Sequence, residues 1–124
     1  MAGYKNLEVW KKAIDLVEEI YKITKAFPDD EKYSLTSQMR RASISIPSNI
    51  AEGNRRNSQR EYIRFLRISF ASGAELETQM IISERLGYIQ DKDIQAVNDR
   101  LEEIMKMLNG LIGSIERNIS SQSS

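Results

Sequence analysis

The sequence predicts an all-α protein built as an antiparallel, up-down-up-down four-helix bundle. Four amphipathic segments follow one another, each with apolar residues three or four positions apart. Only two prolines and six glycines interrupt the 124 residues, which leaves room for long helices. We expect one domain with a single core over residues 1–119, followed by a disordered serine-rich tail at residues 120–124.

The first helix is expected from residue 7 to about residue 27. Asn6 is a candidate N-cap, and Pro28 ends the helix. Its apolar positions fill about half of the helical wheel, with charged residues opposite, which is typical of a helix packed on one side. These positions are Val9, Trp10, Ala13, Ile14, Val17, Ile20, Tyr21, Thr24 and Phe27.

The second helix is expected to begin after Ser34 as its N-cap and to end at Gly53 in a left-handed conformation. Pro47 lies inside it, removes one backbone donor and crowds the carbonyl of Ser43. We expect a kink at Pro47, because the apolar spacing continues on both sides; the alternative is a helix that ends at Ile46. The core positions are Leu35, Met39, Ala42, Ile46 and Ile50.

The third helix is expected to begin after Ser58, because Ser58 and Glu61 form a capping box in which each side chain binds the other residue's amide. It continues to about Leu86, where Gly87 closes it. The inward positions are Tyr62, Phe65, Leu66, Ser69, Gly73, Leu76 and Met80. A patch of small residues permits close approach of a neighbouring helix, namely Ser69, Ser72, Gly73 and Ala74.

The fourth helix is expected from Asp91, its N-cap, to about Asn118. Its apolar residues alternate in steps of three and four, which is an unbroken heptad pattern. That pattern predicts a left-handed packing seam with a shallow crossing angle. The seam consists of Ile94, Val97, Leu101, Ile104, Leu108, Leu111 and Ile115.

A second apolar line follows the third helix, offset by roughly 100° from its core positions. It consists of Ile63, Phe70, Ala74 and Ile81, and the second helix adds Ile44 and Ala51 opposite its own core. One interpretation is a broad buried face within a single subunit. We favour a subunit interface, because the outer faces of a four-helix bundle are normally solvated.

The composition excludes several kinds of site. The sequence has no cysteine and no histidine, so thiolate metal sites, imidazole bases and the Glu-x-x-His motifs of di-iron bundles are absent. We therefore expect no metal, no cofactor and no catalytic residue. The charged N-terminal segment has no long apolar run, so we expect neither a signal peptide nor a membrane span, and a cytoplasmic location.

Positive charge is concentrated in residues 37–69. This window has seven arginines against two acids, whereas the whole chain has 18 basic and 18 acidic residues. We interpret the arginines as a candidate surface for phosphate or RNA. The alternatives are a solvated face, or pairing across subunits with Glu75, Glu77, Glu84, Glu102 and Glu103. The seven arginines are Arg40, Arg41, Arg55, Arg56, Arg60, Arg64 and Arg67.

Three residues around the end of the second helix form a second polar group. Asn49, Glu52 and Gly53 are either a binding site or part of the local structure. We favour structural roles, in which Asn49 satisfies backbone groups freed near Pro47 and Glu52 pairs with an arginine. Gly53 then supplies the positive φ that the turn requires.

Three stretches resemble a known family: YKNLEVWKKAIDLVEEIYKIT, LTSQMRRASISIPSNIAEG and SQREYIRFLRISFASGAELETQMIISERLGYI. Through them the chain resembles the 23S rRNA intervening-sequence protein family from residue 4 to about 115, most specifically over residues 40–53. These are small bacterial four-helix bundle proteins, historically filed with ribosomal proteins. The resemblance implies a homopentameric, barrel-like assembly with no known catalytic activity.

The family is also similar to the accessory variability protein of diversity-generating retroelements, a basic pentamer that binds reverse transcriptase and nucleic acid. The present chain departs from that relative because it is neutral overall. Our leading hypothesis is a noncatalytic homo-oligomer that contacts RNA, or a nucleic-acid-bound protein, through its arginine-rich segment. The alternative is a protein-binding scaffold without a nucleic-acid role, in which the arginines pair subunits; an enzyme is the least favoured class.

Overall fold

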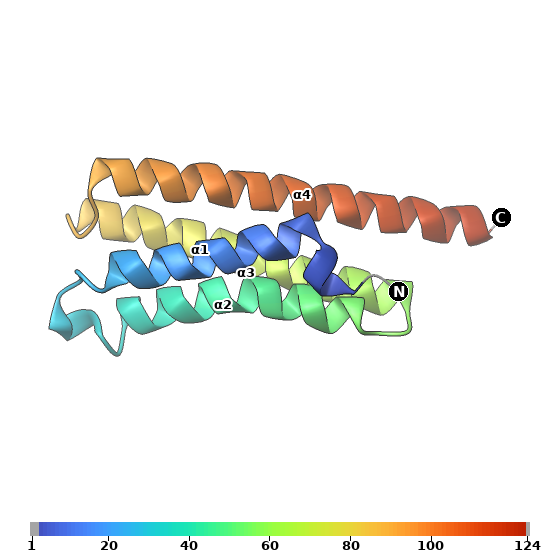
Figure 1. Cartoon of the computed structure of the whole chain (residues 1–124), viewed down its shortest axis with the longest axis horizontal. Helices are drawn as coiled ribbons and strands as arrows, with labels where there is room; N and C mark the ends of the chain where they lie inside the picture. Colours follow the sequence, from blue (N-terminus) through green and yellow to red (C-terminus); the bar gives the residue numbers. More distant parts are fainter. Residues whose placement is uncertain (1–2, 124) are drawn as a thin grey trace.

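The computed structural model describes residues 3–123, which form four long helices packed side by side in a ring. Figure 1 shows each helix running antiparallel to the next, so the predicted up-down-up-down four-helix bundle is confirmed. Two single-turn 3-10 helices precede α1 and α2. The helices are α1 (Glu8–Thr24), α2 (Leu35–Asn54), α3 (Gln59–Arg85) and α4 (Asp91–Ser123).

All four helices contribute side chains to one continuous core. Most predicted core positions are buried, but Leu16 of α1 is fully buried and was not among them. In α4, Ile112 is buried whereas Leu111 is only half-buried, so the predicted heptad seam is wrong at Leu111, although its last residue, Ile115, is buried as predicted. The largest fully buried side chains are Leu16, Ile20, Met39, Ile46, Ile50, Leu66, Leu76, Met80, Leu101, Ile104, Leu108 and Val97.

The start and the end of α1 both differ from the expectation. Asn6 lies in the 3-10 helix Tyr4–Asn6, and Leu7 occupies the N-cap position without a side-chain hydrogen bond, so the predicted Asn6 cap is wrong. The helix ends at Thr24, before Phe27. Phe27 is nevertheless buried, because its ring packs 5.3 Å from that of Tyr88.

Helix α2 is continuous through Pro47, so the alternative of a helix that ends at Ile46 is wrong. The kink at Pro47 stays a prediction. Asn49 donates from Nδ2 to the Ser45 carbonyl (2.8 Å) and to Ser45 Oγ (2.9 Å). These hydrogen bonds do not reach the Ser43 carbonyl, which is the group that loses its helical donor at Pro47.

Gly53 lies within α2 and does not have a positive φ, so its predicted role as a left-handed terminator is wrong. Its position instead permits close contact between α2 and α3. A Cβ atom at Gly53 would lie 2.8 Å from the Phe65 Cβ and 3.1 Å from the Tyr62 carbonyl oxygen. Further along this contact, Ser69 Oγ donates to the Ile46 carbonyl at 2.9 Å.

The end of α3 has the glycine that the sequence predicted, and its start has half of the predicted capping box. The amide of Glu61 donates to Ser58 Oγ at 3.2 Å. The Glu61 carboxylate accepts instead from Arg64 Nε at 3.1 Å, so only the Ser58 half of the predicted capping box forms. At the other end, Gly87 has φ 77° and the Tyr88 amide donates to the Ser83 carbonyl, which completes a Schellman motif.

Replacing Ser58 with alanine is expected to lower the free energy of unfolding by about 1 kcal/mol, because one amide of the first α3 turn loses its acceptor. Urea denaturation followed by far-UV circular dichroism measures this change. The matched control is Ser34→Ala. The Ser34 hydroxyl donates to Glu31 rather than capping an amide of α2, so we expect a loss below about 0.5 kcal/mol. Equal losses in the two variants would contradict the assignment.

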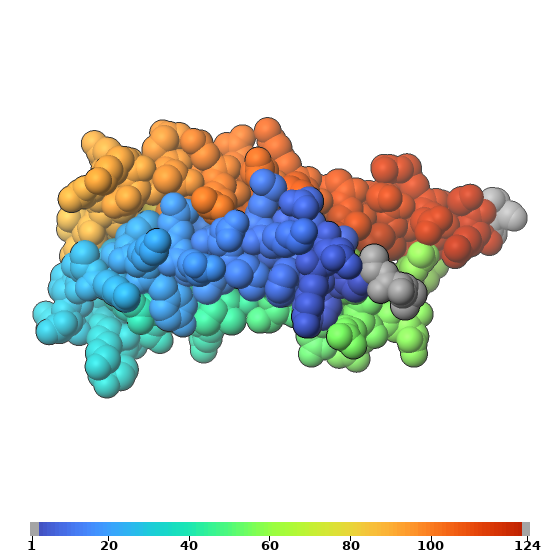
Figure 2. Space-filling model, viewed as in Figure 1, coloured from blue at the N-terminus to red at the C-terminus, as the bar shows by residue number. Residues whose placement is uncertain are grey.

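Helix α4 extends well beyond the other helices. It has 33 residues, about 50 Å at 1.5 Å per residue, whereas α1 has 17 residues. Figures 1 and 2 show its C-terminal end projecting past α1 and α2. The predicted end near Asn118 and the predicted disordered tail are therefore wrong for residues 120–123; residue 124 lies outside the described residues.

Candidate interaction surfaces

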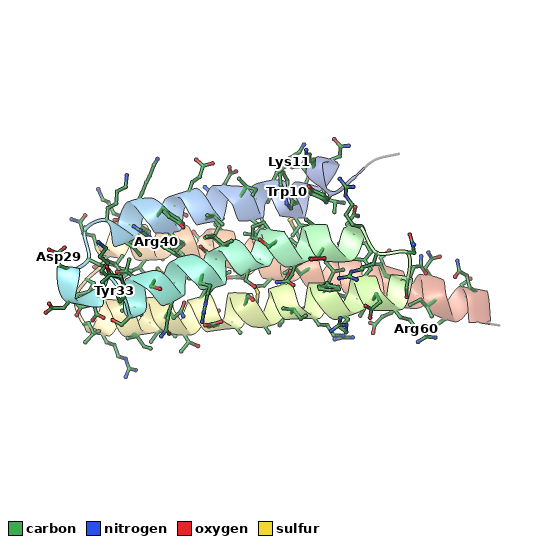
Figure 3. All side chains as sticks on the ribbon, turned by 90° about the horizontal axis from the view of Figure 1, so that it is seen from below. Trp10, Lys11, Asp29, Tyr33, Arg40 and Arg60 are labelled. Carbon is green, nitrogen blue, oxygen red and sulfur yellow. The ribbon has the colours of Figure 1, made fainter. Side chains whose placement is uncertain are left out.

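The seven predicted arginines do not form a single surface. Arg40 and Arg41 lie in the first half of α2, whereas the other five surround the α2–α3 turn and the first turns of α3. Arg41 and Arg55 are fourteen residues apart, which corresponds to about 20 Å along α2. Figure 3 shows Arg40 toward one end of the bundle, near Tyr33, and Arg60 at the opposite end.

Arg40 is held by the end of α1. Its Nε donates to Thr24 Oγ1 at 2.9 Å, and its guanidinium lies 4.4 Å from the centre of the Tyr21 ring. The carbonyl end of a helix carries partial negative charge, so this cation stabilises the end of α1. Arg40 therefore has a structural contact within its own chain.

Three further arginines form ion pairs within the chain, all at exposed positions. Exposed pairs contribute only about 0–1 kcal/mol each, so their guanidinium groups can exchange a carboxylate for another anion at small cost. None of these carboxylates is among the five glutamates expected as partners across subunits. The pairs are Arg56–Glu52 (3.3 Å), Arg64–Glu61 (3.1 Å) and Arg67–Glu116 (2.8 Å).

Within residues 3–123, four of the seven arginines form no ion pair: Arg40, which is held by Thr24 and Tyr21, and Arg41, Arg55 and Arg60. Arg55 lies 5.4 Å from the centre of the Tyr4 ring. Arg60 lines an open polar hollow of about 390 Å³ between the start of α3 and the C-terminal end of α4. We call Arg55, Arg56 and Arg60, which lie in and next to the α2–α3 turn, the α2–α3 arginine cluster.

The glutamates proposed as partners across subunits include three with contacts inside the chain. Glu103 accepts from Lys12 at 2.7 Å, a contact that raises the pKa of Lys12 and lowers the pKa of Glu103. Glu102 pairs with Lys106 at 3.5 Å. Glu75 accepts from Gln79 at 3.3 Å. Glu77 and Glu84 form no ion pair within residues 3–123.

Two of the predicted interface residues, Ile44 and Ala51, lie beside a groove between α1 and α2. This groove has a volume of about 260 Å³, and Trp10 and Pro47 contribute to its mostly apolar wall. Ile44 is 40% exposed. Figure 3 shows Trp10 on α1 beside this part of the bundle. We call this feature the α1–α2 groove.

The other predicted interface residues form the line along α3. Ile63 and Phe70 are half-buried and pack partly against the core, whereas Ala74 and Ile81 are exposed, Ile81 by 49%. The single subunit therefore covers the first half of the line and leaves its second half open. We call Ala74 and Ile81 the α3 apolar ridge.

Another exposed apolar set, not predicted from the sequence, lies on α3 and at its C-cap. Ile68, Ile82 and Leu86 are 38%, 43% and 53% exposed. Their spacing of 14 and 18 residues from Ile68 places them on one side of the helix, away from the core positions. That spacing was the signal by which the sequence could have revealed them.

Two kinds of feature are absent from the part of the chain that the structure describes. No group of three or more histidine, cysteine, aspartate or glutamate residues is arranged to hold a metal ion. Over the same residues, none of the helices combines the length and the apolar character needed to cross a membrane.

Comparison with known proteins gives a matching family and several similar solved structures. A family model described as 23S rRNA-intervening sequence protein matches residues 5–110. The fold is similar to the crystal structure of a protein of unknown function from the S23 ribosomal protein family of Bacteroides thetaiotaomicron VPI-5482. The TM-score is 0.78 at 25% sequence identity, and the match covers 85% of this chain and 95% of that one. No curated protein matches the chain.

Proposed function

Because the chain belongs to the 23S rRNA-intervening sequence protein family, we propose that it is a noncatalytic, self-assembling bundle protein that contacts RNA or RNA-bound protein. The contact is made by the α2–α3 arginine cluster. The observation that carries this proposal is the position of Arg55 and Arg60, which flank the start of α3 without an ion-pair partner in residues 3–123.

The electrostatics of the α2–α3 end favour a phosphate group. The first amides of α3 face this end, and a helix N-terminus carries partial positive charge. Arg56 adds a third cation, because its exposed pair with Glu52 at 3.3 Å is weak enough to open. Since the whole chain has no net charge, RNA would bind at this end and not over the whole surface.

Two unlike apolar surfaces support self-assembly. The α1–α2 groove is concave and contains Ile44, and the α3 apolar ridge presents Ile81 on another helix. When the ridge of one subunit fills the groove of the next, the contact is heterologous, and repeated contacts of that kind form a ring if the rotation between subunits closes. The family resemblance makes five the proposed number of subunits.

Replacing Arg55, Arg56 and Arg60 together with glutamine is expected to weaken binding of a fluorescent single-stranded RNA 20-mer at least about ten-fold. Removing three phosphate contacts should also reduce the slope of log affinity against log salt by about two. Fluorescence anisotropy at several salt concentrations measures both effects.

The matched control removes three positive charges elsewhere, as Lys22→Gln, Lys92→Gln and Lys106→Gln. All three lysines are exposed and lie outside the α2–α3 end. This variant should bind RNA with nearly the affinity of the wild type. Equal weakening in both triple variants would mean that RNA responds to net charge alone, and the proposed contact would be wrong.

A second candidate function is a protein-binding scaffold without a nucleic-acid role. It is favoured by the contacts of Arg40, Arg56, Arg64 and Arg67 with groups of the same chain. In this case the arginines stabilise the subunit, and the wild type should show no anisotropy change with RNA even at low salt.

A further inference from the structure

A separate hollow lies between the end of α1 and the start of α2, at the opposite end of α2 from the α2–α3 arginine cluster. Its volume is about 420 Å³, within the range of about 300–1,000 Å³ that is typical of ligand clefts. Tyr33 and Arg40, both in its wall, lie at the same end of the bundle in Figure 3. Neither the family match nor the structural neighbour assigns a role to it.

The wall of this hollow is positively charged. Lys32, Arg40 and Arg41 line it, and no acid does. Arg41 is exposed and has no ion-pair partner within residues 3–123, so its guanidinium is open to an anion. Glu31 is the acid nearest to Lys32 in sequence, and its carboxylate is occupied by the Ser34 hydroxyl at 2.6 Å and the Tyr88 hydroxyl at 2.9 Å.

Tyrosine rings form the second component of the hollow. Tyr33 is 88% exposed, which is unusual for an aromatic side chain; the Lys32 ammonium lies 5.5 Å from its ring centre, and the opposite ring face is open for stacking. Tyr21, also in the wall, has the Arg40 guanidinium 4.4 Å from its ring centre. An open ring next to guanidinium groups is the combination by which proteins hold a nucleotide base and its phosphate.

The start of α2 adds polar groups to the same wall. Thr36 and Ser37 line the hollow as the second and third residues of this 20-residue helix. Ser34 does not cap the helix with its side chain. The Thr36 hydroxyl is buried behind the wall and has no hydrogen-bond partner within residues 3–123. The start of a helix also carries partial positive charge, which adds to the charge of Lys32, Arg40 and Arg41 in this wall.

We propose that the hollow at the start of α2 binds a nucleoside phosphate, either free or as a unit of single-stranded RNA. Arg41 and the start of α2 hold the phosphate, and Tyr33 stacks on the base. This site is distinct from the proposed RNA contact of the α2–α3 arginine cluster. The hollow borders the α1–α2 groove, because Ile44 lines both of them.

Isothermal titration calorimetry with AMP, adenosine and inorganic phosphate tests the site. Arg41→Gln is expected to weaken AMP binding about ten-fold and to leave adenosine binding nearly unchanged. Tyr33→Ala is expected to weaken both AMP and adenosine about ten-fold, because the stacking surface is lost. Both side chains are exposed, so the variants should keep the circular dichroism spectrum and urea midpoint of the wild type.

The matched control is Arg60→Gln, which removes an exposed, unpaired arginine at the other end of the bundle and should bind AMP as the wild type does. The proposal is overturned if the wild type binds neither AMP nor the single-stranded RNA. It is also overturned if Arg41→Gln and Tyr33→Ala bind AMP with the affinity of the wild type.

A single-stranded RNA hexamer distinguishes the two sources of the nucleotide. If the hexamer displaces AMP and Tyr33→Ala weakens it to the same degree, the hollow binds a unit of an RNA strand. If AMP binds and the hexamer does not displace it, the ligand is a free nucleotide. The α2–α3 triple glutamine variant should keep AMP binding in either case, so the two proposals fail separately.

Discussion

Replacing Gly53 with alanine is expected to lower the free energy of unfolding by about 2–4 kcal/mol. The new Cβ would lie 2.8 Å from the Phe65 Cβ, 2.9 Å from the Tyr62 Cδ1 and 3.1 Å from the Tyr62 carbonyl oxygen. Two of these atoms are fixed to the α3 backbone, so α2 and α3 must separate to relieve the overlap. Urea denaturation followed by circular dichroism measures the loss.

Two other glycines supply matched controls for this effect. Gly110 lies in α4 with nothing within 4 Å of an added Cβ, so Gly110→Ala should stabilise the protein by about 0.5–1 kcal/mol. A Cβ at Gly73 would meet the Met105 side chain, which can move. The change in the free energy of unfolding for Gly73→Ala should therefore lie between those for Gly53→Ala and Gly110→Ala. A Gly53→Ala protein as stable as the wild type would contradict the close contact between α2 and α3.

The periodic apolar pattern was sufficient to predict the four helices and their order. The side chains that share one face of a helix can be identified from that helix alone, because they lie three and four positions apart. The same holds for Ser58 and Gly87, whose hydrogen bonds join residues within a single turn. These features therefore required no knowledge of how the helices pack.

The errors concern positions where packing between helices decides the outcome. Gly53 occupies a helical position that only the approach of α3 explains, and its sequence signal is the same as that of a helix terminator. Ile112 is buried where the heptad spacing predicted Leu111, in the part of α4 that projects past the start of α1. Neither distinction can be made from one helix alone.

The candidate sites were predicted less well than the fold. The seven arginines are close in sequence, but α2 separates them into two groups about 20 Å apart. Their partners include Thr24 for Arg40 and Glu116 for Arg67, residues that only the tertiary structure brings near. The hollow beside Tyr33 was missed because its wall combines the end of one helix, a connection and the start of another.

Replacing Ile81 with glutamate is expected to abolish self-assembly, so that light scattering reports the 14.3 kDa mass of one chain. Ile81 is 49% exposed in the single subunit, so the new carboxylate remains in water when the subunit is alone. In the assembly it would be buried against the apolar α1–α2 groove without a partner, which should weaken association at least about a hundred-fold. Asn98→Glu adds the same charge at an exposed site on α4 and should assemble normally.

The proposed contact joins two different surfaces, so each surface can be removed by its own substitution. If the ridge of one subunit fills the groove of the next, Ile44→Glu in the groove should also produce single chains. Each variant then keeps the surface that the other has lost, so an equal mixture of Ile81→Glu and Ile44→Glu should form a species of two subunits. A contact between identical surfaces would give no such recovery on mixing. A wild-type protein that stays at the mass of one chain at high concentration would contradict self-assembly altogether.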